Sequence, residues 1–206
     1  MIDLAPIDRA GLAPRWTAAP WLNSAPLELA ELRGRVVVLH AFQMLCPGCV
    51  MHGLPQAARI HANFDRRDVI VVGLHTVFEH HSAMGPQALE AFVHEYRVPF
   101  PVGVDCPGDS TVPTTMAAYE MRGTPTLVLI DRHGRRRAQI FGRPEDLELG
   151  AAVQALVAES DRPRPASDCD EQGCLIEAAG PDRVGALRAQ PSRPLEPVST
   201  EVIGTG

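Results

Sequence analysis

Short apolar runs, separated by amphipathic segments and turns, dominate the pattern of the chain. Two of these runs, residues 35–42 (RVVVLHAF) and 69–74 (VIVVGL), are apolar on both faces, which is typical of interior strands of a sheet covered by helices. The segment from Cys46 to about Phe64 lies between them and predicts a helix. A helix that joins two such strands forms a βαβ unit with a right-handed crossover. The pattern therefore predicts an α/β fold.

The same alternation continues to about residue 159. A helix that begins at Pro86 carries apolar residues at i, i+3, i+4 and i+7, and a helix that begins at Pro144 closes the domain. The turn at 131–134 is too short to join parallel strands, so the strands on either side of it form an antiparallel hairpin. The remaining elements are expected as strands at 100–104, 126–130 and 136–141 and a short helix at 114–121.

The two ends of the chain differ from this central part. Residues 1–14 are rich in proline and alanine and predict an arm, followed by an edge strand near 16–22 and a helical turn from Leu27. The C-terminal segment holds many prolines, glycines and acids and predicts a largely irregular tail, with short order around 174–179. We therefore expect three parts, an arm at 1–14, one domain at 15–159 and a tail at 160–206.

Composition excludes several classes of function. The 206 residues include 19 basic side chains, counting arginine and lysine together, and 25 acidic ones, which gives a net charge of −6. The chain therefore lacks the basic surface that nucleic-acid binding needs. All 19 are arginines, which excludes Schiff-base chemistry through lysine. The longest apolar runs fall far short of the roughly 20 residues that span a bilayer. The first residues lack a signal-peptide pattern, so we expect a cytoplasmic protein without nucleic-acid or membrane partners.

The strongest chemical signal is the motif Cys46-Pro47-Gly48-Cys49, directly after the first interior strand and at the start of a helix. Backbone N–H groups and the helix dipole favour negative charge at Cys46, which then attacks a disulfide, and Cys49 resolves the mixed disulfide. The alternative is that the pair forms half of a zinc site, which needs two further ligands. The helix-start position favours the redox interpretation.

The segment ELRGRVVVLHAFQMLCPGC, followed later by Gly123-Thr124-Pro125-Thr126 before a strand pair, resembles the thioredoxin superfamily in its TlpA-like and redoxin (AhpC/TSA-related) branch. The similarity covers about residues 15–158. It implies a thioredoxin-like fold with a central mixed sheet flanked by helices and an inserted helix and strand. It also implies a thiol-disulfide oxidoreductase that reduces disulfides through Cys46 and Cys49 and needs no cofactor.

The same resemblance assigns roles to the second motif. It implies a cis peptide bond before Pro125, close to the cysteine pair, and substrate binding by the backbone of Thr124. A trans proline that merely starts a strand is the alternative. The expected partners are a protein or small-molecule disulfide substrate and an upstream reductant that the sequence does not identify.

Some positions depart from the family pattern. Leu45 stands where the family usually has tryptophan, and His40 stands where thioredoxins have a buried aspartate. His40 could accept the proton of Cys49 near neutral pH, or it could be a neutral core histidine, and both alternatives stay open. Gln43 and Leu39 replace the threonine or serine and the proline of peroxiredoxins, so a thiol peroxidase is a less favoured alternative.

A histidine-rich loop follows the second interior strand. Because the carboxyl ends of parallel strands meet at one edge of a sheet, His75, Glu79, His80 and His81 could lie near the cysteine pair and bind copper or zinc with it. A copper-handling protein is therefore an alternative function. A solvated polar loop explains the same residues without any metal.

Three further cysteines and an arginine run need an interpretation. Cys169 and Cys174 could close a disulfide or pass electrons to Cys46 as a thiol relay, or they could be idle exposed thiols. Cys106 lies in a turn and is expected to be structural. The arginine run 135–137 is expected at a solvated strand edge.

Overall fold

The computed structural model describes residues 1–109, 111–159, 169–170 and 173–174. The chain forms two compact units, Met1–Asp161 and Arg162–Gly206. The first unit contains a six-stranded sheet and its helices, and the second contains a two-stranded sheet. The expected order at 175–179 lies outside the described residues.

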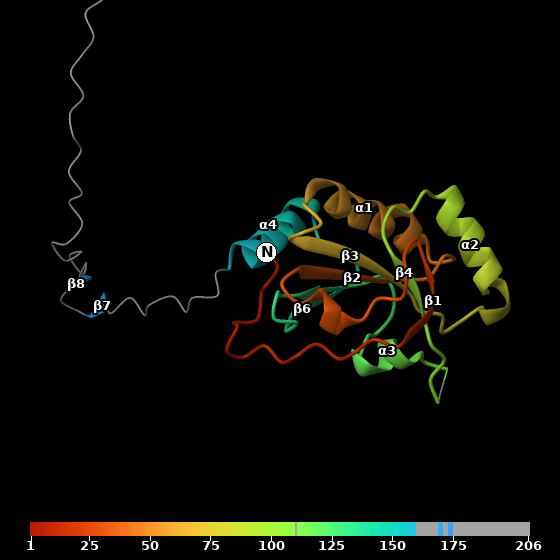
Figure 1. Cartoon of the computed structure of the whole chain (residues 1–206), viewed down its shortest axis with the longest axis horizontal. Helices are drawn as coiled ribbons and strands as arrows, with labels where there is room; N and C mark the ends of the chain where they lie inside the picture. Colours follow the sequence, from red (N-terminus) through yellow and green to blue (C-terminus); the bar gives the residue numbers. More distant parts are fainter. Residues whose placement is uncertain (110, 160–168, 171–172, 175–206) are drawn as a thin grey trace, which may run out of the picture. The chain divides into compact units, whose positions relative to one another are not determined.

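The sheet of the first unit is mixed, in the order β1-β4-β3-β2-β5-β6 (Figure 1). Its central strand β2 pairs parallel with β3 and antiparallel with β5, so both of its edges are hydrogen-bonded. This arrangement confirms the predicted thioredoxin-like α/β fold. The strands are β1 (Ala18–Leu22), β2 (Val36–Phe42), β3 (Val69–His75), β4 (Val102–Asp105), β5 (Thr126–Ile130) and β6 (Arg136–Phe141).

Helices cover both faces of this sheet. Figure 1 shows α1 (Leu54–Asn63), α2 (Pro86–Glu95) and α4 (Asp146–Ala158) over one face and α3 (Thr114–Ala118) on the other. Successive side chains of β2 point to opposite faces of the sheet, so the sheet has an apolar core on each face. Val36 and Val38 pack under α1, α2 and α4. Val37 and Leu39 pack on the other face, toward α3 and the 3₁₀ helix η1 (Leu29–Leu32). In the described part of the chain, the helices are too short or too polar to cross a bilayer.

The sequence pattern and the structure differ at a few element ends. The hairpin strands β5 and β6 have the predicted bounds, whereas β4 begins at Val102 and not at Phe100. Pro99 and Pro101 carry no N–H to donate to a neighbouring strand, and Pro101 contributes only its carbonyl, which accepts from Gly73 at 2.8 Å. The helix begins within the cysteine motif, at Pro47 and Gly48, and continues through a π-helical turn, η2 (Cys49–Gly53), into α1.

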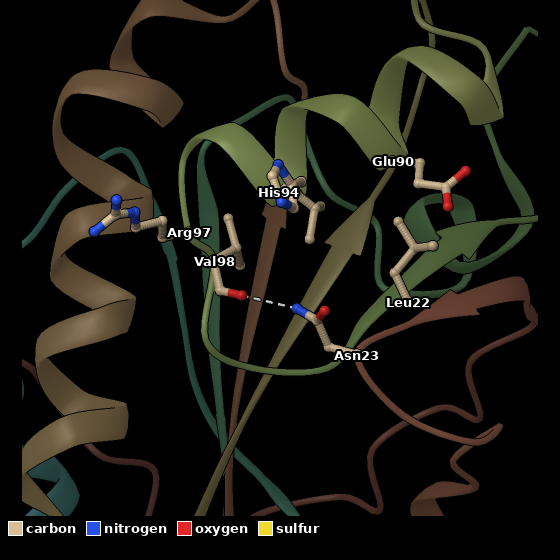
Figure 2. Close-up of a pocket in the computed structure, with 7 residues that line it drawn as sticks. Leu22, Asn23, Glu90, His94, Arg97 and Val98 are labelled. Atoms are coloured by element: carbon tan, nitrogen blue, oxygen red, sulfur yellow. Dashed lines mark hydrogen bonds between the residues drawn. The ribbon is translucent and has the colours of Figure 1, made fainter.

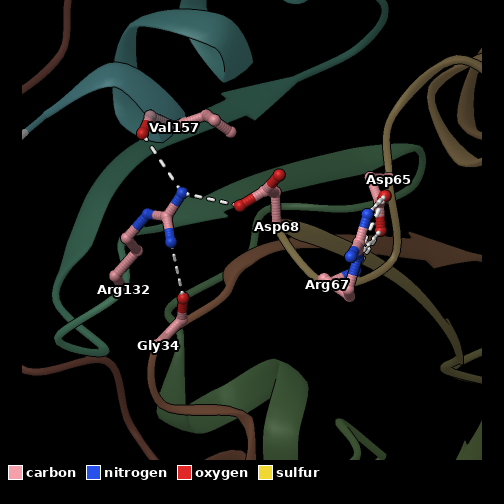
Figure 3. A network of polar contacts seen from close by, with 6 residues as sticks. All are labelled: Gly34, Asp65, Arg67, Asp68, Arg132 and Val157. Carbon is pink, nitrogen blue, oxygen red and sulfur yellow. Dashed lines mark hydrogen bonds and ion pairs between the residues drawn. The ribbon is translucent and has the colours of Figure 1, made fainter.

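Arg132 connects four segments at one end of the sheet (Figure 3). β2 begins at this end, and the cysteine motif follows β2 at the other end. Its guanidinium donates to the carbonyls of Gly34 at 2.9 Å and Val157 at 3.2 Å and pairs with Asp68 at 2.9 Å. These contacts join the β5–β6 turn to the start of β2, the start of β3 and the end of α4. Arg67, in the same view, pairs with Asp65, two residues away in the chain.

The N-terminal arm lies along β6. Ala5 and Arg137 exchange hydrogen bonds, with the Ala5 N–H donating to the Arg137 carbonyl at 2.8 Å, and Leu12 pairs with Arg135 as an isolated bridge. The Arg137 side chain is buried and pairs with Asp131 and Glu159. The expectation of a solvated edge at 135–137 is therefore wrong for Arg137, because the arm and two carboxylates cover and neutralise it.

Candidate active site

The cysteine motif lies where β2 ends and the helix begins. The Cys46 N–H donates to the Gln43 carbonyl at 3.2 Å, and the Val50 N–H donates to the Cys46 carbonyl at 3.0 Å, which starts the helical turn. Cys46 is partly exposed, whereas Cys49, the first residue of the π-helical turn, is fully buried. The two thiols therefore differ in access, as attacking and resolving cysteines must.

The two cysteine side chains are in direct contact. Their sulfurs lie 2.6 Å apart, and the Cys49 N–H donates to Cys46 Sγ at 3.2 Å. An N–H group at the first turn of a helix stabilises negative charge, here on Cys46. Burial raises the pKa of the Cys49 thiol to about 12, and its hydrogen bond with Cys46 acts in the same direction. Cys49 is therefore protonated at neutral pH.

The segment before β5 forms the second wall of the site. The Thr124–Pro125 peptide bond is cis, and Cys46 Sγ lies 3.7 Å from the Thr124 carbonyl oxygen. Thr126 Oγ1 donates to the Gly123 carbonyl at 2.6 Å, and the Gly142 N–H donates to the Pro125 carbonyl at 2.8 Å, so the segment is anchored on both sides. The structure thus brings Thr124 and Pro125 together with the cysteine pair.

His40 lies in the middle of β2, beneath the helix that begins at the cysteine motif. Its ring is 1% exposed, packs against Gly53 and stacks on Phe42 with centroids 6.0 Å apart. Among the described residues neither ring nitrogen has a hydrogen-bond partner. Burial lowers the pKa of His40 to about 4, so the ring is neutral at neutral pH. The lowered pKa of His40 and the raised pKa of Cys49 both disfavour proton transfer from the Cys49 thiol to the His40 ring.

Gln43 is a site residue that the sequence identified only as a missing peroxidase position. Its side chain is buried, accepts from the Phe78 N–H at 3.4 Å and contacts Glu79 Oε1 at 3.4 Å. Its carbonyl holds the Cys46 N–H. Gln43 therefore connects the cysteine loop to the loop after β3. Its position three residues before Cys46 is the sequence feature that could have identified it as a site residue.

The loop histidines are not gathered with the cysteines. His75 ends β3 as a buried side chain beside Phe42, and burial lowers its pKa to about 4, whereas His80 and His81 are exposed. Within the described ranges no group of three or more histidine, cysteine or acidic side chains could hold a metal ion. His75 is better described as a core residue.

Three cysteines lie outside the motif in the sequence. Cys106 follows β4, its N–H donates to the Thr17 carbonyl at 3.0 Å, and its carbonyl accepts from the Thr114 N–H at 2.9 Å, as in a structural turn. The side chains of Cys169 and Cys174 are outside the described residues, so the relay to Cys46 stays a prediction.

A separate surface hollow lies between β1 and α2 (Figure 2). Asn23 Nδ2 donates to the Val98 carbonyl across it at 2.8 Å. No predicted site residue lines this hollow, so the cysteine pair remains the candidate site. The lining residues are Leu22, Asn23, Glu90, Val93, His94, Arg97 and Val98.

Comparison with known proteins agrees with this geometry. The AhpC/TSA family matches residues 12–138. A solved thioredoxin-like superfamily protein is 58% identical, with a TM-score of 0.71, over 72% of this chain and 97% of its own. A thiol-disulfide isomerase structure from Corynebacterium glutamicum is 46% identical, with a TM-score of 0.71, over 75% of this chain and 100% of its own.

Curated proteins give more distant matches. The thiol-disulfide oxidoreductase ResA of Halalkalibacterium halodurans is 27% identical over 114 residues, which is 55% of this chain. The chain spans 57% of the length of that relative and 12% of another curated relative.

Proposed function

Since the chain belongs to the AhpC/TSA family, we propose that it is a thiol-disulfide oxidoreductase that reduces disulfides through Cys46 and Cys49. One observation carries the proposal. A partly exposed thiol at the start of a helix lies 2.6 Å from a fully buried one, which is the arrangement that two-step disulfide exchange requires. The names of the oxidoreductase and isomerase relatives support the same chemistry.

The reaction follows from the different access of the two thiols. The Cys46 thiolate attacks one sulfur of the substrate disulfide, a mixed disulfide forms, and the first substrate thiolate leaves. Cys49 then loses its proton and attacks Cys46 Sγ, which releases the second substrate thiolate. Two electrons pass from the cysteine pair to the substrate, and the thiol protons go to the leaving groups.

Protein disulfides are the proposed main substrates, because the segments that flank the cysteine pair carry exposed apolar side chains. Leu45 precedes Cys46 and is 53% exposed, and Met51 lies in the π-helical turn and is 66% exposed. Phe141 is exposed opposite Thr126, next to the Thr124–Pro125 segment. A polypeptide bound here gains apolar contacts on both sides of its disulfide.

The cytoplasm is the proposed site of action. A dithiol that reduces substrates has to be regenerated by thiol donors, and the glutathione and thioredoxin systems of the cytoplasm supply them. Cell fractionation followed by immunoblotting tests the location. Recovery of the chain only outside the cytoplasm contradicts it.

Trapping tests the activity. In the Cys49→Ser variant Cys46 can still attack but the mixed disulfide cannot be resolved, so we expect covalent complexes that a thiol reductant dissolves. Cys46→Ser is the matched control, and peptide mapping should find nothing captured at the Cys46–Cys49 site, because the variant retains only the buried thiol of that pair. Absence of complexes with Cys49→Ser, in cells and with a model disulfide, contradicts the proposal. Capture of Cys169 or Cys174 would identify the tail as the exchange partner.

A further inference from the structure

The C-terminal unit carries a cysteine pair that the proposed function does not use. Its backbone forms two short strands, β7 (Cys169–Asp170) and β8 (Gly173–Cys174), which pair antiparallel. The register places Cys169 directly opposite Cys174 and Asp170 opposite Gly173. The strand pairing, and not only the spacing in the sequence, therefore brings the two cysteine positions together.

This register suits a disulfide. Directly opposite residues of an antiparallel pair have Cα atoms about 4.5 to 5.5 Å apart. Disulfides join residues whose Cα atoms are about 4.4 to 6.8 Å apart, so either kind of opposite pair is in range. Only two residues separate Asp170 from Gly173 in the chain, and a connection this short fixes the register of a hairpin.

We propose that Cys169 and Cys174 form a second dithiol/disulfide centre, closed across the β7–β8 pair, whose substrates are disulfides and thiols. One of the two thiolates attacks a substrate disulfide, forms a mixed disulfide and releases the first substrate thiolate. The other attacks the sulfur of its neighbour, so that the Cys169–Cys174 bond forms and the second substrate thiolate leaves. Two electrons pass to the substrate, and the two thiol protons go to the leaving thiolates.

The reverse reaction with a thiol donor restores the dithiol. Both cysteines lie in the unit Arg162–Gly206, whereas Cys46 and Cys49 lie in Met1–Asp161. The centre therefore works whether or not the first pair is active, and failure of one proposal leaves the other intact.

The test uses the full chain with Cys46→Ser, Cys49→Ser and Cys106→Ser, so that only the C-terminal pair can react. The variant is equilibrated with reduced and oxidised glutathione at a series of ratios, alkylated and analysed by mass spectrometry. We expect a product that has lost two hydrogens and carries no glutathione, with a share that rises as the buffer becomes more oxidising. Glutathione adducts on both cysteines without the internal bond would overturn the proposal, as would thiols that stay reduced throughout.

Two matched controls use the same background. Cys169→Ser removes one partner, so the remaining cysteine should collect a single glutathione and form no internal bond. Cys174→Ser combined with Gly173→Cys moves the second cysteine to the position opposite Asp170, and we expect loss of the internal disulfide. An internal disulfide as abundant in this shifted variant as in its parent would show that the strand register is irrelevant, and the proposal would fall.

Peptide mapping of the oxidised, unsubstituted chain gives a measurement that does not depend on these substitutions. We expect a peptide in which Cys169 is joined to Cys174. Mapping that finds these two cysteines bonded only to other cysteines, or not bonded at all, contradicts the proposal.

Discussion

His40 and Gly53 lie so close that a Cβ atom on Gly53 would be 2.5 Å from Cε1 of the imidazole and 2.8 Å from Nε2. Gly53 ends the π-helical turn that begins at Cys49, and His40 lies in the middle of β2. This contact therefore limits how closely the helix that carries Cys49 can approach the sheet. Gly53 has ordinary helical angles, φ −63 and ψ −53, so glycine is needed here for space and not for backbone conformation.

We expect Gly53→Ala to lower the free energy of unfolding by about 1–3 kcal/mol, because the added methyl group overpacks the His40 contact. Urea unfolding measures the change. Gly48→Ala is the matched control, since its Cβ would make an ordinary 3.6 Å contact with Pro125 Cδ. The control should change stability by less than about 0.5 kcal/mol. Equal losses in the two variants would contradict the packing argument.

The two interpretations of His40 make different kinetic predictions. A ring with a pKa of about 4 that has no hydrogen-bond partner among the described residues is a poor acceptor for the proton of Cys49. We expect His40→Leu to slow the release of substrate from the mixed disulfide by no more than about threefold, whereas loss of a general base typically costs roughly 100-fold or more. Stopped-flow measurement of product release at neutral pH decides between them. A large loss of rate with unchanged substrate affinity would establish His40 as the proton acceptor.

Stability should depend on pH through the two buried histidines. Burial lowers the pKa of His40 and His75 from 6.5 to about 4 in the folded chain. The unfolded chain therefore binds more protons between these values, so their contribution is complete above pH 6.5 and is lost as pH falls toward 4. We expect a loss of a few kcal/mol across this window in urea unfolding.

A variant with His40→Leu and His75→Leu should show a flatter dependence of stability on pH. His52 is exposed, so His52→Ala should leave the dependence unchanged. A dependence that survives the double substitution would show that other groups carry it.

The two thiols of the site should react at very different rates. At pH 7 a thiol with a pKa near 12 is ionised in only about one molecule in 10⁵, and Cys49 is also fully buried. We expect iodoacetamide to label Cys46 at least roughly 100-fold faster than Cys49 in the reduced, folded chain. Peptide mapping over time measures both rates, and unfolding in urea should bring them together. Similar rates in the folded chain would contradict the buried, protonated state of Cys49.

Arg132 and Arg67 form a matched pair for testing the network in Figure 3. Arg132→Ala removes three contacts between separate segments, so we expect a loss of about 1–3 kcal/mol in the free energy of unfolding. Arg67→Ala removes one exposed pair with Asp65, whose charges are screened by solvent, so it should change stability much less than Arg132→Ala does. A larger loss for Arg67→Ala than for Arg132→Ala would refute the argument.

The fold was predictable because its strongest signals are local. Continuous apolar runs identified β2 and β3, and the short turn between β5 and β6 required an antiparallel hairpin, with the observed bounds. The cysteine motif and the Thr124–Pro125 segment were recognised from their order along the chain and from the family resemblance, which the AhpC/TSA match confirms.

The features that the sequence did not reveal depend on contacts between distant segments. Arg137 appeared solvated, since nothing local indicates that the N-terminal arm and Glu159 enclose it. His75 appeared as a possible loop ligand, although β3 extends one residue further and buries it. Gln43 connects the cysteine loop to the loop after β3, and this connection exists only when the two loops lie against each other in the folded chain. Hydrophobic patterns report burial along one element and carry little information about which segment covers it.

The place of β2 between β3 and β5 has a consequence for synthesis of the chain. The ribosome makes the dithiol segment well before it makes Thr124 and Pro125, so a growing chain carries both cysteines before the other wall of the site exists. During that interval the thiols can exchange with any disulfide they meet. Only pairing of β5 with β2 places the Thr124 carbonyl beside Cys46, so the second wall of the site is completed late, as the last strands join the sheet.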